Sequence, residues 1–181
     1  MGLIARHPRP AELENVTLEE IARRYVARFA ERKPDWHAFA DAAISGYRRA
    51  QHRFIGNTSG KPDDNVIPAR AFTLSIMYVP AGQGNAAHTH EVEEVFFVLR
   101  GHLMVFFEDE SGKRVETVLG PWDCASCPAG VIHGYHNNSL EPVYVIVQAG
   151  KAKPEFMGYA DEDLFKRRDE HVRKHKEAQR G

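Results

Sequence analysis

Short segments of β-branched and aromatic residues recur between Ala71 and Gln148, and this pattern constrains the fold more than any other feature. Turn residues such as Pro80-Ala81-Gly82 and Gly120-Pro121 separate the segments. No helical segments of about 10–15 residues alternate with them, as a doubly wound α/β sheet would require. The spacing predicts an all-β sandwich or barrel, with strands over residues 71–79, 94–99, 102–108, 114–119, 123–127, 131–136 and 142–148.

The regions on either side of this pattern have helical character. Thr17 and Glu20 have the spacing of a capping box, which predicts a helix that begins at Thr17 and ends before Pro34. A second helix is predicted from Asp35 to Gln51 by its apolar spacing. The expected organisation is a helical extension and loop at 1–70, a barrel at 71–149, and a C-terminal segment with a charged helix at 150–181.

Composition excludes several classes of protein. The formal net charge is -1, which argues against a nucleic-acid partner or an anionic membrane surface. No apolar run approaches the roughly 20 residues of a membrane span, and the N-terminus lacks the apolar stretch of a signal peptide. A cytoplasmic protein is expected. Cys124 and Cys127 are too few for a disulfide framework, and we expect reduced thiols, one of which could point towards a pocket.

A cluster of histidines carries the chemistry. His88 and His90 have the same parity on an extended segment, so both imidazoles face the same side, and Glu94 shares that parity. A fourth donor has to come from another strand, and His133, just after the Pro128-Ala129-Gly130 turn, is well placed for this. The four residues are predicted to bind one divalent transition metal, which could be Fe, Mn, Ni, Cu or Zn. Two octahedral positions would stay open, as in catalytic sites.

The spacing around these four residues resembles the two motifs of the cupin superfamily. The first motif is present without a gap: Gly82, QGNAA, His88-Thr89-His90, EVE, Glu94, VFFVLR, Gly101. The second is Trp122, DCASC, Pro128-Ala129-Gly130, VI, His133, GYH, Asn137. Trp122 stands where the family has Gly, and we expect Gly120-Pro121 to supply the bend there. The resemblance implies a single jelly-roll barrel, or double-stranded β-helix, with the metal in its mouth.

The resemblance leaves three functions open. The three-His, one-Glu set resembles that of quercetin and acireductone dioxygenases, which implies an oxygenase that acts on an enol, diketone or phenol. The alternatives are a non-redox isomerase, decarboxylase or lyase, and a small-molecule-binding cupin without catalysis. Glu94 is the candidate catalytic base. Tyr78, Gln83, Phe96 and Val98 are candidate pocket residues, and the chain is expected to form a homodimer or higher homo-oligomer.

Overall fold

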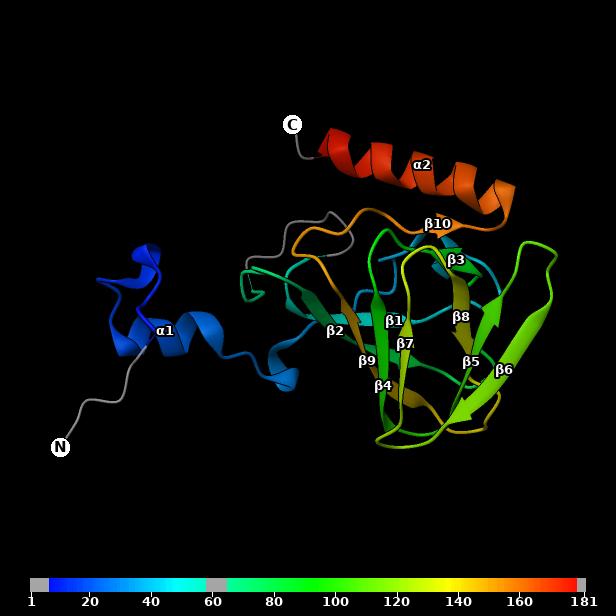
Figure 1. Ribbon diagram of the computed structural model, residues 1–181, viewed down its shortest axis with the longest axis horizontal. Coiled ribbons are helices and arrows are strands. Elements are labelled where there is room, and N and C mark those ends of the chain that lie inside the picture. The colour runs from blue at the N-terminus through cyan, green and yellow to red at the C-terminus, as the bar shows by residue number, and fades with distance from the viewer. Residues whose placement is uncertain (1–6, 58–64, 179–181) are drawn as a thin grey trace.

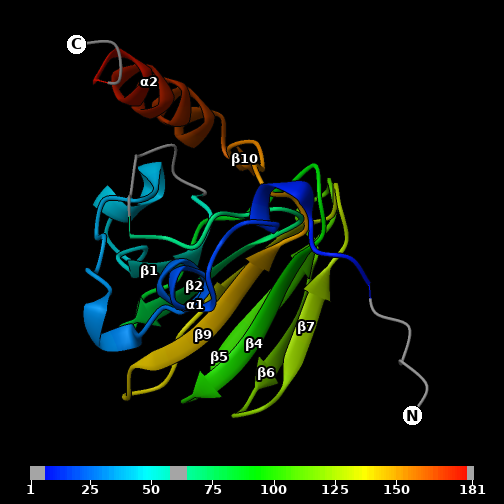
Figure 2. The ribbon, with the colours of Figure 1, turned by 90° about the vertical axis from the view of Figure 1, so that its left-hand side faces the viewer.

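Two antiparallel five-stranded sheets form the body of the molecule in the described part of the chain, residues 7–57 and 65–178 of a computed structural model (Figure 1). The first sheet contains, in spatial order, β1 (Ala50–Ile55), β2 (Thr73–Val79), β9 (Val143–Ala149), β4 (Glu94–Arg100) and β7 (Cys124–Cys127). The second contains β10 (Gly158–Tyr159), β3 (His88–Thr89), β8 (Ile132–His136), β5 (Leu103–Glu108) and β6 (Arg114–Leu119). Figure 2 shows the first sheet in front of the strands of the second.

The hydrophobic core lies between the two sheets. Strands β2, β4 and β9 alternate between buried and half-buried residues, because successive side chains of a strand point to opposite faces. The inward set includes Phe96, Val98, Val105 and Val145, which are fully buried. All seven strands predicted between residues 71 and 148 are present, and the predicted all-β jelly-roll class is confirmed.

The predicted helix from Asp35 to Gln51 is wrong. Those residues form only a 3-10 turn at Ala40–Ala43, and strand β1 begins at Ala50. The backbones of Asp35 and Gln51 pair with each other, and β1 pairs with β2 along its length. Long-range pairing therefore overrides the local apolar spacing. The first sheet thus includes a strand from within residues 1–70.

Helix α1 (Leu18–Tyr25) begins as predicted, since Thr17 and Glu20 form the capping box. It ends at Tyr25, well before the predicted end near Pro34. The chain beyond it turns back to the barrel, where the Phe29 ring lies 4.9 Å from that of His52. Helix α1 itself contributes no buried residue and lies apart from the barrel in Figure 1.

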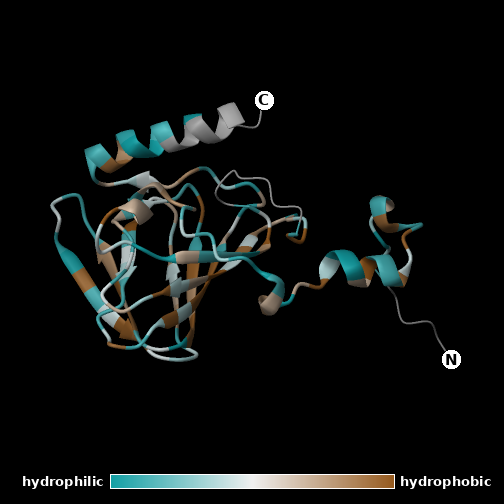
Figure 3. Cartoon of the chain, turned by 180° about the vertical axis from the view of Figure 1, so that it is seen from behind, coloured by the Kyte–Doolittle hydropathy of each residue, from teal (hydrophilic) through white to brown (hydrophobic). Residues whose placement is uncertain are grey.

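The predicted C-terminal helix is present as α2 (Glu162–Ala178), and its last predicted residues, 179–181, lie outside the described part. The Asp161 carboxylate accepts a hydrogen bond from the Leu164 amide at 2.9 Å and so caps the first turn. Leu164 packs with Ala86 and Tyr159 in a small second core above the barrel. The part of the helix that Figure 3 colours is mostly hydrophilic. Among the described residues, no helix has the length and apolar character needed to cross a membrane.

Candidate metal centre

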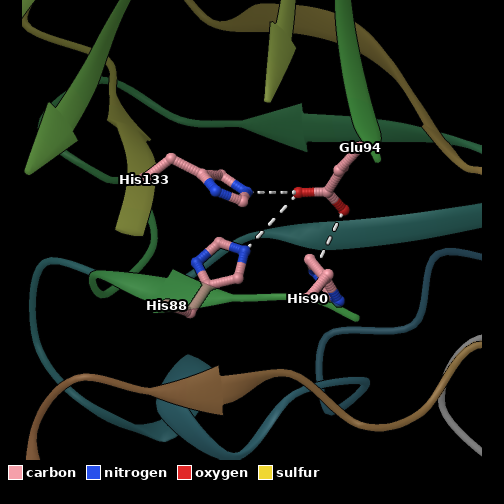
Figure 4. Close-up of side chains that lie close together, drawn as sticks. All are labelled: His88, His90, Glu94 and His133. Atoms are coloured by element: carbon pink, nitrogen blue, oxygen red, sulfur yellow. Dashed lines mark hydrogen bonds and ion pairs between the residues drawn. The ribbon is translucent and has the colours of Figure 1, made fainter. Parts of the chain in front are cut away.

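Three strands bring the four predicted ligands together at one end of the barrel. His88 lies on β3 and is paired directly with His133 on β8, while Glu94 is the first residue of β4 in the opposite sheet. His90 follows β3 by one residue. Their side chains converge (Figure 4), and one potential ligand atom from each lies within 4.8 Å of the other three. The sequence-predicted cluster is therefore assembled by the fold.

The distances suit a single ion. The Glu94 carboxylate lies 3.2 Å from Nε2 of His133, 3.4 Å from Nε2 of His90 and 3.5 Å from Nε2 of His88. With metal–ligand bonds of about 2.1 Å, adjacent ligands of an octahedral ion are about 3 Å apart and opposite ones about 4.2 Å apart. The donor set, three imidazoles and one carboxylate, is one that transition metals accept.

Backbone carbonyls orient two of the imidazoles. Nδ1 of His88 lies 2.9 Å from the Ala86 carbonyl oxygen, and Nδ1 of His133 lies 2.8 Å from that of Val131. A carbonyl can only accept, so each Nδ1 carries the proton and donates it. This leaves the lone pair of Nε2 directed at the centre of the cluster, which is the usual arrangement of metal-binding histidines.

His90 supplies a further sign of fit. Both of its ring nitrogens are buried, and neither makes a hydrogen bond in the described part of the chain, although Nε2 lies 3.4 Å from the Glu94 carboxylate. Buried polar atoms normally have partners, because leaving one unsatisfied costs about 1–3 kcal/mol. A metal ion beside Nε2 would satisfy one of these atoms.

The charges around the cluster determine the protonation state of Glu94. Burial by itself would raise the pKa of Glu94, but the three neighbouring histidines hold it well below its usual range. Burial lowers the pKa of His88, which favours its neutral form. Burial acts the same way on His90, but the carboxylate of Glu94 outweighs it and raises that pKa. The carboxylate is therefore ionised at neutral pH.

A small cavity, with about 40 Å³ of space for water-sized molecules, adjoins the cluster at His90 and Glu94. Its wall comes from four parts of the chain: the segment before β1, the inner face of the first sheet, the segment that leads to β10, and helix α2 through Arg168. Most of the lining is apolar, and it includes Phe39, Met77, Ala149, Phe156, Met157 and Tyr159. The ligand cluster thus has an accessible side.

The candidate pocket residues fall elsewhere. Phe96 and Val98 point inward as predicted, but they belong to the core, and the Phe96 ring lies behind the cluster, 5.9 Å from that of His133. Tyr78 lies on the outer face of the sheet, where its ring packs 5.3 Å from that of Tyr144. The Gln83 side chain accepts a hydrogen bond from the Arg48 amide. None of the four lines the cavity.

Sequence reasoning missed most of the cavity wall. Met77 had a usable signal, because it shares the inward parity of Val79 on β2, whereas Tyr78 has the outward parity. Phe39, Phe156 and Met157 had none, since they lie outside regular strands and reach the cavity only through the path of the chain.

The turn of the second motif begins at Gly120-Pro121 as expected, and the Asp123 amide closes it by donating to the Gly120 carbonyl oxygen at 3.1 Å. Trp122 is the third residue of this turn. It adopts the left-handed conformation itself, with φ of 75°, and is the one non-glycine residue to do so in the described part of the chain. Its side chain is 74% exposed and contacts the Phe97 ring edge-on. The glycine of the family is therefore replaced at a position where the backbone still requires the conformation that glycine favours.

Cys124 and Cys127 are both free, the first exposed and the second buried. Cys127 lies beside Glu94 in the pairing of β4 with β7. Burial, together with that carboxylate, raises the pKa of its thiol to about 12. Cys127 is thus a neutral, packed thiol next to the cluster.

Known proteins share this fold. Residues 75–148 match the family model described as the cupin domain. The polyketide cyclase RemF from Streptomyces resistomycificus is 19% identical, with 78% of this chain and 89% of that chain covered and a TM-score of 0.58. A cupin 2 domain-containing protein from Halorhodospira halophila is 22% identical over 71% and 82%, with a TM-score of 0.51. Oxalate decarboxylase from Lactobacillus farciminis is 16% identical over 84% and 41%, with a TM-score of 0.58.

At these identities the solved structures establish the fold and nothing finer. Comparison with curated protein sequences found no significant match. The two motif segments, and all four candidate ligands, lie inside the matched residues. The chain therefore contains a cupin domain, at residues 75–148.

Proposed function

We propose that this protein is a metal-dependent enzyme with dioxygenase-type chemistry on a small organic substrate of the enol, diketone or phenol class. One observation carries the proposal: the four-residue cluster opens, at His90 and Glu94, into a mostly apolar cavity. Structural metal sites are usually closed, whereas catalytic ones keep a side open to the substrate.

The four residues of the cluster would act together as metal ligands. His88, His90, His133 and Glu94 would hold the ion, which when bound would supply positive charge for an oxygen donor and a redox centre. Three neutral imidazoles and one carboxylate cancel one of the two charges of a divalent ion. The remaining charge favours a substrate that presents an anionic oxygen, such as an enolate or a phenolate.

The proposed task of Glu94 is that of a ligand. Its low pKa makes the carboxylate a weak proton acceptor, so the candidate role as general base receives little support from its surroundings. A substrate that reaches the site already ionised needs no base. This matches acidic enols and phenols better than unactivated alcohols.

The cavity favours a substrate with an apolar body. Phe39, Met77 and Ala149 present hydrocarbon to its interior. Two of its polar residues are engaged elsewhere: the Gln51 amide donates to Ser75, and the Tyr159 hydroxyl accepts from the Asp41 amide. An apolar wall excludes water and strengthens the interaction of the charged oxygen with the ion.

The test is metal analysis of the purified protein, followed by turnover assays with a panel of β-diketones and phenols, with and without O₂. We expect one Fe, Mn, Ni or Cu per chain and consumption of O₂ in step with loss of substrate. The variants His90→Ala and Glu94→Ala should lose both metal and turnover. His102→Ala, outside the cluster, is the matched control and should retain both.

Other outcomes identify the alternatives. Turnover that proceeds equally well without O₂ would replace the oxygenase by a non-redox isomerase, decarboxylase or lyase. A panel member that binds tightly but is never converted would indicate a binding protein. A purified chain that takes up no transition metal would refute the proposal. The homo-oligomer and the cytoplasmic location stay predictions.

A further inference from the structure

We propose that the buried ion pair of Asp41 and Arg49 is a positioning device that holds the backbone before His88 in the conformation needed for metal binding. The proposal rests on the metal site of the proposed function, but it concerns residues outside both cupin motifs. Asp41 lies in the 3-10 turn before β1, and Arg49 directly precedes β1.

The ion pair is fully buried. Nη1 of Arg49 lies 3.0 Å from Oδ1 of Asp41, and the two side chains are 1% and 0% exposed. Burying two charges is expensive, and apolar residues of similar volume often serve stability as well or better. The ion pair is therefore not explained by a gain in stability. Its contacts indicate a different role.

Asp41 connects directly to the metal-binding segment. Its second carboxylate oxygen, Oδ2, accepts a hydrogen bond from the Ala86 amide at 3.0 Å. The carbonyl oxygen of the same residue, Ala86, accepts from Nδ1 of His88 at 2.9 Å. Ala86 therefore links the two groups: its amide is bound by the buried Asp41 carboxylate, and its carbonyl oxygen orients the His88 ring.

Arg49 contacts the same segment two residues earlier, at Gly84. Its Nη1 donates to the Gly84 carbonyl oxygen at 3.4 Å and to that of Tyr47 at 3.0 Å. From the opposite side, Oδ1 of Asn85 accepts from the Tyr135 amide at 2.7 Å. Residues 84–86 are thus fixed between the N-terminal segment and strand β8, two residues before the first ligand.

The same pair also contacts the cavity wall. The Arg49 guanidinium lies over the Phe39 ring, 4.4 Å from its centre. The Asp41 amide donates to the Tyr159 hydroxyl at 3.3 Å. Both rings line the cavity, so Arg49 through its side chain and Asp41 through its backbone also contact the substrate side of the site.

Two charge-neutral double variants isolate the contact with Ala86. Both replace Arg49 by Met, so neither leaves a buried charge unpaired. Asp41→Asn keeps an oxygen that can accept from the Ala86 amide, whereas Asp41→Leu has similar volume and no acceptor. The matched control is Asp35→Leu with Arg53→Met, which removes a second largely buried ion pair of the same region, 2.6 Å long, from a strand that bears no ligand.

The readouts are the affinity for Co²⁺, by competition with a chromophoric chelator, and the visible absorption spectrum of bound Co²⁺. We expect the Leu variant to bind Co²⁺ about 10–100-fold more weakly than the Asn variant, because loss of groups that orient a ligand has this effect. Its spectrum should also change. The Asp35 control is expected to lose thermal stability while its Co²⁺ affinity and spectrum stay those of the wild type.

Equal Co²⁺ affinity and equal spectra in the two Asp41 variants would overturn the proposal. If the Leu variant fails to fold, Asp41→Ser with Arg49→Met takes its place, since serine is too short to reach the Ala86 amide. A wild-type chain that takes up no Co²⁺ would instead refute the proposed function. In that case the exchange rate of the Ala86 amide, slow in the Asn variant and faster in the Leu or Ser variant, still decides whether Asp41 holds the segment.

Discussion

Removal of His133 should abolish the stabilisation that a bound metal gives to this protein. His133 is fully buried, its Nε2 lies 3.2 Å from the Glu94 carboxylate, and it pairs with His88 across two strands. His133→Ala therefore deletes a donor from the centre of the cluster. His136→Ala, on the same strand but hydrogen-bonded to Asn138, is the matched control.

The expected magnitude follows from mass action. A metal present at 100 times its Kd stabilises the folded state by about 2.7 kcal/mol. For a domain of this size, each 1 kcal/mol shifts Tm by about 2–4 °C, so the wild type should gain about 5–11 °C. Loss of a ligand should weaken binding by at least about 100-fold, since even groups that only orient ligands contribute 10–100-fold. At the same metal concentration the variant then gains at most about 0.4 kcal/mol, or roughly 1–2 °C.

The assay is differential scanning calorimetry of each protein with and without Co²⁺. The metal-induced shift is compared within each variant, because deleting a buried ring also lowers the Tm of the metal-free protein. A His133→Ala protein that keeps the full wild-type shift, with one metal per chain, would refute the assignment of this residue. If the His136→Ala protein also loses the metal-induced shift, the effect of His133→Ala is not specific to a metal ligand.

Three further predictions concern other parts of the molecule. Trp122→Gly should raise Tm by roughly 2–4 °C, because relief of a left-handed non-glycine conformation stabilises by about 1 kcal/mol and the lost contact with Phe97 is largely exposed; a lower Tm would contradict this. At pH 8 iodoacetamide should modify Cys124 rapidly and Cys127 only after unfolding, since burial raises the pKa of Cys127 to about 12; equal labelling by mass spectrometry would be the contrary result. Met77→Trp should leave the metal content unchanged but weaken substrate binding at least tenfold by filling the cavity, and unchanged KM and kcat would exclude the cavity as the substrate site.

The strand pattern and the ligand set were open to prediction for a local reason. Side chains alternate along a strand, so the inward position of Phe96 follows from its place on β4. The four candidate ligands follow from the spacing of the two motifs, which survives although His88, Glu94 and His133 lie on three different strands. The capping box at Thr17 is likewise a matter of four consecutive residues. For the strand pattern and the capping box, the determining interactions lie within one element.

The errors share the opposite cause. Residues 35–51 have helical spacing, yet Asp35 pairs with Gln51 and β1 with β2, and such pairing depends on strands distant in the sequence. Tyr78 was placed in the pocket because the start of its strand does not reveal which parity faces inward. Packing against Trp36 and Tyr144 from other segments decides it.

The sequence by itself therefore determined the jelly-roll class and the four residues that can bind a metal, since both depend on short-range periodicity and motif spacing. Only the tertiary structure decided what surrounds them. The apolar cavity, the orientation of His88 through Ala86, and the burial of Asp41 against Arg49 arise where segments far apart in the chain meet. Such long-range contacts depend on the packing of the whole molecule, and no short stretch of sequence predicts them.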